Sequence, residues 1–171
     1  MRKRRIIGLC ALLLVLSSQA SAIYTLTPTE QKVLASWLAA HPQFRAATDL
    51  DCDCSEDIKQ MRTVSDGVWK AVPDYHPYSV SGDLNGDGAL DFAVVVVERS
   101  SSVKKATLLV FNGPLRTSDA RPSFSASDLD LLGKGIFFGP PRPKPYRLVV
   151  GGFETDNTNL LIPKGRSYKL Q

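Results

Sequence analysis

The chain has 171 residues, and its 21 basic and 17 acidic residues give a formal charge of +4. Four basic residues and no acidic ones lie in residues 1–22, so subtracting them leaves 17 of each sign. This balance removes the argument for nucleic-acid binding that an overall basic charge would make. With only three cysteines in the sequence, the chain is not a disulfide-rich scaffold and needs a hydrophobic core for its stability.

The first 22 residues have the three parts of a secretory signal peptide. A basic segment at 2–5 precedes an apolar run at 6–16, and the small residues that follow end in Ala20-Ser21-Ala22. The apolar run is shorter than the roughly 20 residues that a membrane anchor needs. Lipidation of Cys10 is disfavoured because Leu9, a large residue, precedes it. The pattern predicts Sec-type cleavage after Ala22. It leaves one periplasmic or extracellular domain at 23–171 with no membrane span.

Residues 27–65 are predicted to be helical. Thr27, Pro28 and Glu30 have the spacing of a capping box, and the residue before Pro42 ends the first helix. A second helix is expected from Ser55, because two acidic residues follow it in the first turn. The apolar positions of the two helices are Val33, Leu34, Trp37 and Leu38 in the first, and Ile58, Met61 and Val64 in the second.

Residues 78–171 are predicted to be rich in β-structure. The apolar, β-branched run at 92–97 is typical of a central strand that is covered on both faces. Further strands are expected at 78–82, 107–111, 135–138, 146–150, 159–162 and 167–170. Their short connections favour antiparallel pairing. The polar stretch at 116–127 and the proline-rich stretch at 139–145 are predicted to be loops. The fold class is therefore α+β, with N-terminal helices packed on a mainly antiparallel sheet.

Residues 83–91 contain the one pattern with specific chemistry. Side-chain oxygens recur at positions 1, 3, 5 and 9 of a loop, and position 7 offers a backbone carbonyl, which gives the ligand set Asp83, Asn85, Asp87, Ala89 and Asp91. Calcium prefers six to eight such oxygen ligands. Gly86 and Gly88 permit the positive φ angles of a tightly curled backbone. The pattern predicts a structural calcium site; the alternative is an acidic, glycine-rich hairpin without an ion.

Residues 81–97 resemble the calcium loop of the FG-GAP and VCBS repeats, in which such a loop is followed at once by a hydrophobic strand. The resemblance implies calcium binding through the same five residues. Those repeats build β-propellers, whereas this chain has no second copy of the loop, so a propeller is not expected. An EF-hand is not expected either, because its position 12 needs a glutamate and that position is Val94.

Cys52 and Cys54 directly precede the second predicted helix. In an exported protein, two cysteines this close are expected to form a small disulfide. A free or intermolecular thiol and a metal or redox site are the alternatives. Zinc would need two further ligands, and the two histidines of the chain, His41 and His76, each precede a proline as residues in turns do.

The expected function is binding, with calcium in the loop and a protein or a cell-envelope component as partner. The aromatic residues at 69–78 are either a contact surface or a part of the core. The alternative is a small secreted enzyme, either a hydrolase or a thiol exchanger, in which the calcium loop supports the fold. The sequence has no G-x-S-x-G, H-E-x-x-H or phosphate-binding glycine motif.

Overall fold

The computed structural model describes residues 24–100, 105–140, 142–153 and 157–171. The predicted signal peptide and its cleavage site lie outside these residues, as does part of the proline-rich stretch at 139–145. Over the described residues the fold is α+β and is not a propeller, as predicted. All strand pairs are antiparallel.

The strands form two sheets, where the sequence predicted a single one. The first sheet has the order β1-β3-β4-β5, with β2 also paired to β3, and consists of β1 (Phe44–Ala46), β2 (Ser79–Gly82), β3 (Asp91–Glu98), β4 (Ala106–Phe111) and β5 (Phe124–Leu129). The second sheet has the order β6-β7-β8-β9 and consists of β6 (Lys134–Phe137), β7 (Leu148–Gly152), β8 (Thr158–Lys164) and β9 (Ser167–Leu170).

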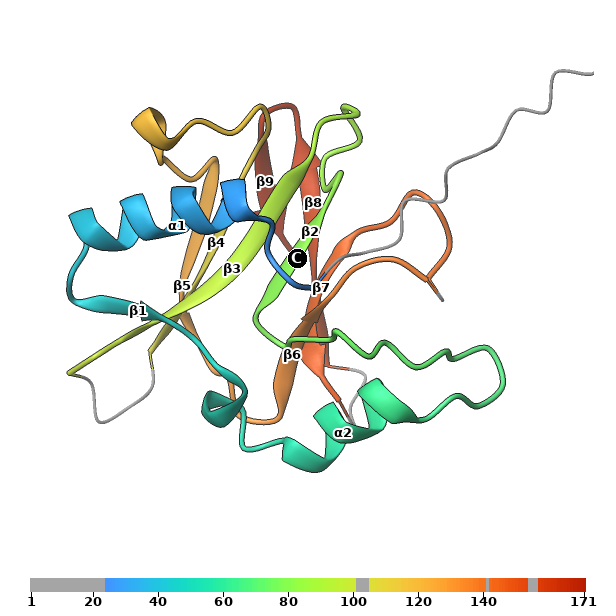
Figure 1. Cartoon of the computed structure of the whole chain (residues 1–171). Coiled ribbons are helices and arrows are strands. Elements are labelled where there is room, and N and C mark those ends of the chain that lie inside the picture. Colours follow the sequence, from blue (N-terminus) through green and yellow to red (C-terminus); the bar gives the residue numbers. More distant parts are fainter. Residues whose placement is uncertain (1–23, 101–104, 141, 154–156) are drawn as a thin grey trace, which may run out of the picture.

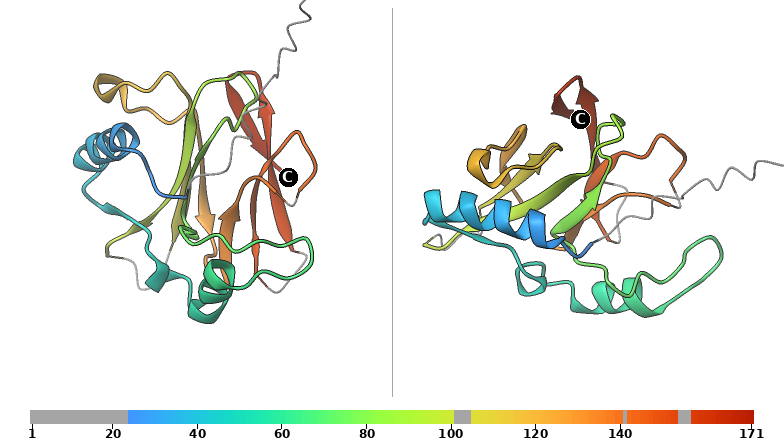
Figure 2. Two further views of the ribbon diagram at one scale, coloured as in Figure 1. Left: turned by 45° about the vertical axis from the view of Figure 1, so that its right-hand side comes forward. Right: turned by 45° about the horizontal axis from the view of Figure 1, so that its top comes forward.

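Helix α1 (Pro28–Ala40) covers the outer face of the first sheet, and the second sheet lies against the other face (Figure 2). Both hydrogen bonds of the predicted capping box at Thr27 and Glu30 are present. Helix α2 (Ser55–Thr63) lies at one end of the two sheets (Figure 1) and buries Ile58. Val64, which the sequence places among the apolar positions of this helix, instead follows its last residue and is 53% exposed.

Strand β3 is the central strand that its sequence predicted. Its alternate residues belong to two separate cores. Phe92 and its even-numbered neighbours pack under α1, whereas Ala93 and its odd-numbered neighbours face the second sheet. Because both faces are covered, every residue from Asp91 to Val97 is buried. The start of this strand, which carries Asp91, is therefore fixed from both sides.

Two strands of the first sheet were not predicted. Strand β1 has only three residues. Strand β5 begins within the stretch at 116–127 that was predicted to be a polar loop, and only Phe124, Ala126 and Leu129 of its six residues are partly buried. A bulge between the pairs Ala106–Leu129 and Leu108–Ala126 interrupts its register. An edge strand that is half exposed and interrupted by a bulge has few of the apolar residues by which strands are recognised.

The two sheets approach each other at both edges. The backbone N–H of Ile136 in β6 donates to the carbonyl of Pro77, just before β2, at 2.7 Å. At the other edge, the Ser167 hydroxyl donates to the carbonyl of Ser123 at 3.3 Å. The connection between β2 and β3, the segment after β4 and the β8–β9 turn consequently lie at the same end of the molecule (Figure 1). None of the helices in the described ranges is long and apolar enough to cross a membrane.

Candidate metal centre

The predicted calcium loop connects β2 to β3 and projects from one end of the two sheets (Figure 1). Gly86 and Gly88 have φ angles of 83° and 85°, as the tight backbone requires. No atom lies close to the position that a Cβ would take at either glycine, so backbone conformation alone calls for glycine there. The sequence prediction of a curled loop at these positions is confirmed.

Asp83 organises the first half of the loop. Its Oδ1 accepts hydrogen bonds from the backbone N–H groups of Gly86, at 2.7 Å, and Asp87, at 3.0 Å. Its Oδ2 accepts from the N–H of Gly88 at 3.0 Å. One carboxylate therefore accepts hydrogen bonds from three successive backbone N–H groups, and the loop curls around it.

Asn85 and Asp87 lie on the exposed part of the loop and contact each other. The Asn85 Nδ2 donates to the Asp87 Oδ2 at 2.9 Å, and the Asp87 Oδ1 accepts from the Ala89 N–H at 2.8 Å. These two hydrogen bonds favour the charged carboxylate and lower the pKa of Asp87. Asp87 is thus a fully ionised group at the surface of the loop at neutral pH.

Asp91 differs from the other acidic residues because it is completely buried. Its Oδ1 accepts from the Gly113 N–H at 2.8 Å, and its Oδ2 accepts from the N–H of Leu84 at 3.0 Å and of Asn85 at 3.3 Å. The Tyr168 hydroxyl oxygen lies 3.5 Å from the same Oδ2. Burial raises the pKa of Asp91, and the backbone donors partly oppose that rise. Asp91 joins the loop to β9 and to the segment after β4.

The five predicted ligands are near one another in sequence and fit calcium in donor type, since all are oxygens. Their side chains are not, however, gathered around one point as they would be around a bound ion. Within the described ranges, no three acidic, histidine or cysteine side chains lie close enough to hold a metal ion. The carboxylates of Asp83, Asp87 and Asp91 accept backbone hydrogen bonds, and Ala89 offers its N–H to Asp87. The residues therefore fit the ion in chemistry, and the loop is held together by its own hydrogen bonds.

No family model, curated protein or solved structure matches this chain. The likeness to the FG-GAP and VCBS loop thus depends on residues 81–97 alone.

Sequence reasoning missed the partners of the loop outside it. Tyr168 and Gly113 reach Asp91 from positions far along the chain, and nothing in the sequence pairs them with it. Glu30 was predicted only as a capping residue. It is fully buried, and its Oε1 also accepts a hydrogen bond from the Ser81 hydroxyl at 2.6 Å. Since Ser81 lies in β2 just before the loop, Glu30 ties the start of α1 to the base of the loop.

Cys52 and Cys54 form a disulfide in the structure, with Cα atoms 5.1 Å apart. Cys52 is fully buried and Cys54 nearly so. A disulfide that exchanges with thiols must be reached by the attacking sulfur, so burial favours a structural pair over a redox site. The oxidised state of the pair in the exported protein stays a prediction.

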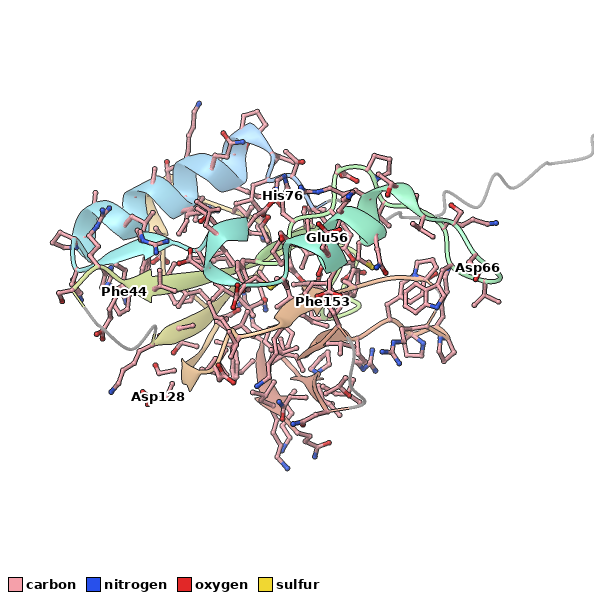
Figure 3. The ribbon with its side chains drawn as sticks, turned by 90° about the horizontal axis from the view of Figure 1, so that it is seen from below. Phe44, Glu56, Asp66, His76, Asp128 and Phe153 are labelled. Atoms are coloured by element: carbon pink, nitrogen blue, oxygen red, sulfur yellow. A yellow bond between two sulfur atoms is a disulfide. The ribbon has the colours of Figure 1, made fainter. Side chains whose placement is uncertain are left out.

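A second polar cluster lies near α2, around His76 (Figure 3). Asp49 of the helix η1 (Asp49–Asp51) accepts from Arg62 at 2.7 Å and lies 3.5 Å from the His76 Nδ1. Arg62 also donates twice to the carbonyl of Tyr75, at 2.7 Å and 2.9 Å. These contacts hold the 64–78 loop against η1 and α2, and the described part of the chain places no serine, threonine or cysteine in hydrogen-bond contact with His76.

The aromatic segment at 69–78 was predicted to be either a contact surface or a part of the core, and its residues fall into both classes. Tyr75 and Tyr78 are buried in the core between the sheets. Trp69, in contrast, is 49% exposed, and its neighbour Val68 is 76% exposed. Of the tryptophan and tyrosine side chains of the segment, only Trp69 is available to a partner.

Proposed function

We propose that this chain is an exported binding domain whose 83–91 loop takes one calcium ion with a structural role. The observation that carries this proposal is the set of oxygen donors on one glycine-containing loop, directly before the central strand. Asp83, Asn85 and Asp87 would hold the ion from the exposed part of the loop. The Ala89 carbonyl and Asp91 complete the set that the FG-GAP and VCBS resemblance implies.

A cation would supply charge neutralisation at this loop. Asp83 and Asp87 share the tip of the loop, and Asp87 raises the pKa of the buried Asp91 through its negative charge. Without a cation these charges repel one another. Such a site, with exposed ligands and no bidentate glutamate at position 12, belongs to the weak extracellular class, with a Kd on the order of 10⁻⁴ M or higher.

Binding, with a protein or a cell-envelope component as partner, is favoured over catalysis. The exposed Val68 and Trp69 support contact with a partner, because exposed aromatic side chains often carry interface energy. The burial of Cys52 and Cys54 disfavours thiol exchange, which is the alternative activity with the most specific residues.

The experiment is thermal unfolding of the mature domain in millimolar calcium and in excess chelator. A ligand that binds only the native state adds about 2.7 kcal/mol at a hundredfold excess over its Kd. Wild type should therefore melt several degrees higher in calcium. Asp87→Ala should remove that difference. Asp66→Ala is the matched control, since Asp66 is an exposed aspartate on the projecting loop after α2 (Figure 3) and should keep the difference. Equal melting temperatures for wild type in both buffers would contradict the proposal.

A further inference from the structure

A cavity of about 390 Å³ lies beside the calcium loop, between α1, the segment 111–123 and the β8–β9 turn. Its accessible apolar lining is Pro114, which is exposed, and Leu115, which is partly buried; Val33 in α1 and Phe111 at the end of β4 lie buried beneath. The cavity is partly open to solvent, so it would enclose only part of a ligand. The segment that lines it includes the short helix η2 (Thr117–Asp119).

Three arginines from separate parts of this lining give the cavity a positive charge. Arg116 precedes η2, Arg121 follows it, and Arg166 lies in the turn between β8 and β9. Asp119, the one acidic residue of the lining, lies 3.4 Å from the Nε of Arg121. Both side chains of that pair are exposed, so the pair is weak. Among the described residues, no ion pair within 4 Å is found for Arg116 or Arg166, although Asp87 of the calcium loop lies near enough to Arg166 to feel its charge.

The polar wall of the cavity is fixed by hydrogen bonds that do not use the arginine side chains. The Asn112 Oδ1 accepts from the Ser123 hydroxyl and from the Tyr168 hydroxyl, both at 2.8 Å. Its Nδ2 donates to the backbone carbonyl of Arg166 at 3.1 Å. Asn112 thus holds the β8–β9 turn against the segment after β4. The backbone position of Arg166 is therefore set before any ligand binds.

We propose that this cavity binds an oxyanion, namely a carboxylate or phosphate group carried by a partly apolar small ligand. Guanidinium groups match the planar fork of a carboxylate and the oxygens of a phosphate through paired hydrogen bonds. Arg116 and Arg166 supply those donors from two sides, and Pro114 and Leu115 offer apolar surface to the rest of the ligand. The residues that line the cavity are not among the predicted calcium ligands, although Arg166 interacts electrostatically with Asp87 of the loop.

The test is titration of the ¹⁵N-labelled mature domain in excess chelator with two probes, inorganic phosphate and benzoate. Each probe that binds should shift amide signals in 112–123 and 165–168. A larger effect of benzoate assigns the site to carboxylates on an apolar body, and a larger effect of phosphate assigns it to phosphoryl groups. Because the titration is carried out without free calcium, its result does not depend on whether the 83–91 loop binds calcium.

Variants decide whether the arginines carry the binding. Loss of a charge-assisted hydrogen bond reduces the free energy of binding. Arg166→Gln or Arg116→Gln should therefore raise the Kd about tenfold. Arg142→Gln is the control, because Arg142 is exposed and does not line the cavity. Because the three arginines are exposed, their replacement should not disturb folding. The same spectra would reveal a variant that had misfolded. Absence of shifts in 112–123 with both probes, or an equal loss with Arg142→Gln, would overturn the proposal.

Discussion

Replacement of Asp91 by asparagine tests the claim that this residue supports the fold itself, apart from any ion. The substitution keeps the size of the side chain but leaves one acceptor oxygen. If that oxygen takes the place of Oδ2, the new NH₂ faces the Gly113 N–H, which is 2.8 Å from Oδ1. If it takes the place of Oδ1, the N–H groups of Leu84 and Asn85 lose their acceptor instead.

At least one buried donor is therefore left unsatisfied in either orientation. An unsatisfied buried donor costs about 1–3 kcal/mol, so we expect a loss of roughly 2–3 kcal/mol in the free energy of unfolding. For a domain of this size, each kcal/mol lowers Tm by about 2–4 °C, which gives a decrease of roughly 4–12 °C.

The assay is urea unfolding, followed by circular dichroism in excess chelator. Asp87→Asn is the control, because its carboxylate is fully exposed and the variant should unfold close to wild type without calcium. If Asp91→Asn unfolded at the same urea concentration as wild type, the assignment of Asp91 as the structural centre of the loop would fail.

Three further predictions concern other parts of the fold. Arg45 binds Asp51 through two hydrogen bonds of 2.7 Å and holds its pKa far below the usual value, so the stability from this pair is complete above about pH 4 and is lost at more acidic pH. Asp51→Asn should cost about 2 kcal/mol at neutral pH and flatten that acid dependence in urea unfolding curves. Ser81→Ala should cost about 1–2 kcal/mol, because it removes a donor from the buried Glu30 carboxylate; an unchanged urea midpoint would show that the bond is not needed. Ellman titration of the unfolded, unreduced protein should find no free thiol if the Cys52–Cys54 bridge forms, and two thiols per chain would reject it.

The elements with strong local signals were predicted well from sequence. The first helix has a complete capping box, and β3 has an unbroken apolar run because both of its faces are buried. Strand β5 gave no such signal, because its exposed edge position allows Ser125 and Ser127 to alternate with partly buried residues. The division into two sheets also could not be read from the strands, since pairing depends on contacts between distant segments.

The candidate site also has features that the sequence predicts and features that it does not. The loop conformation follows from Gly86 and Gly88, whose positive φ angles the sequence anticipates. The burial of Asp91 does not follow from the loop, because it depends on Tyr168 and Gly113, which approach only after the sheets have packed. From the sequence, Asp91 is therefore predicted as one calcium ligand among several. In the structure it is a buried residue that supports the fold, which Asp83 and Asp87 do not do.

Isothermal titration calorimetry of the chelator-treated mature domain with calcium tests the central claim most directly. We expect heat of binding for one ion per chain with a Kd on the order of 10⁻⁴ M or higher. Magnesium should bind more weakly, because it demands near-ideal octahedral geometry at shorter distances and loses its bound water reluctantly. The same titration of Asp87→Ala should give no binding heat. If the wild-type protein gave none at millimolar calcium, the 83–91 loop would be a hairpin held only by its own hydrogen bonds, and the proposed calcium site would be wrong.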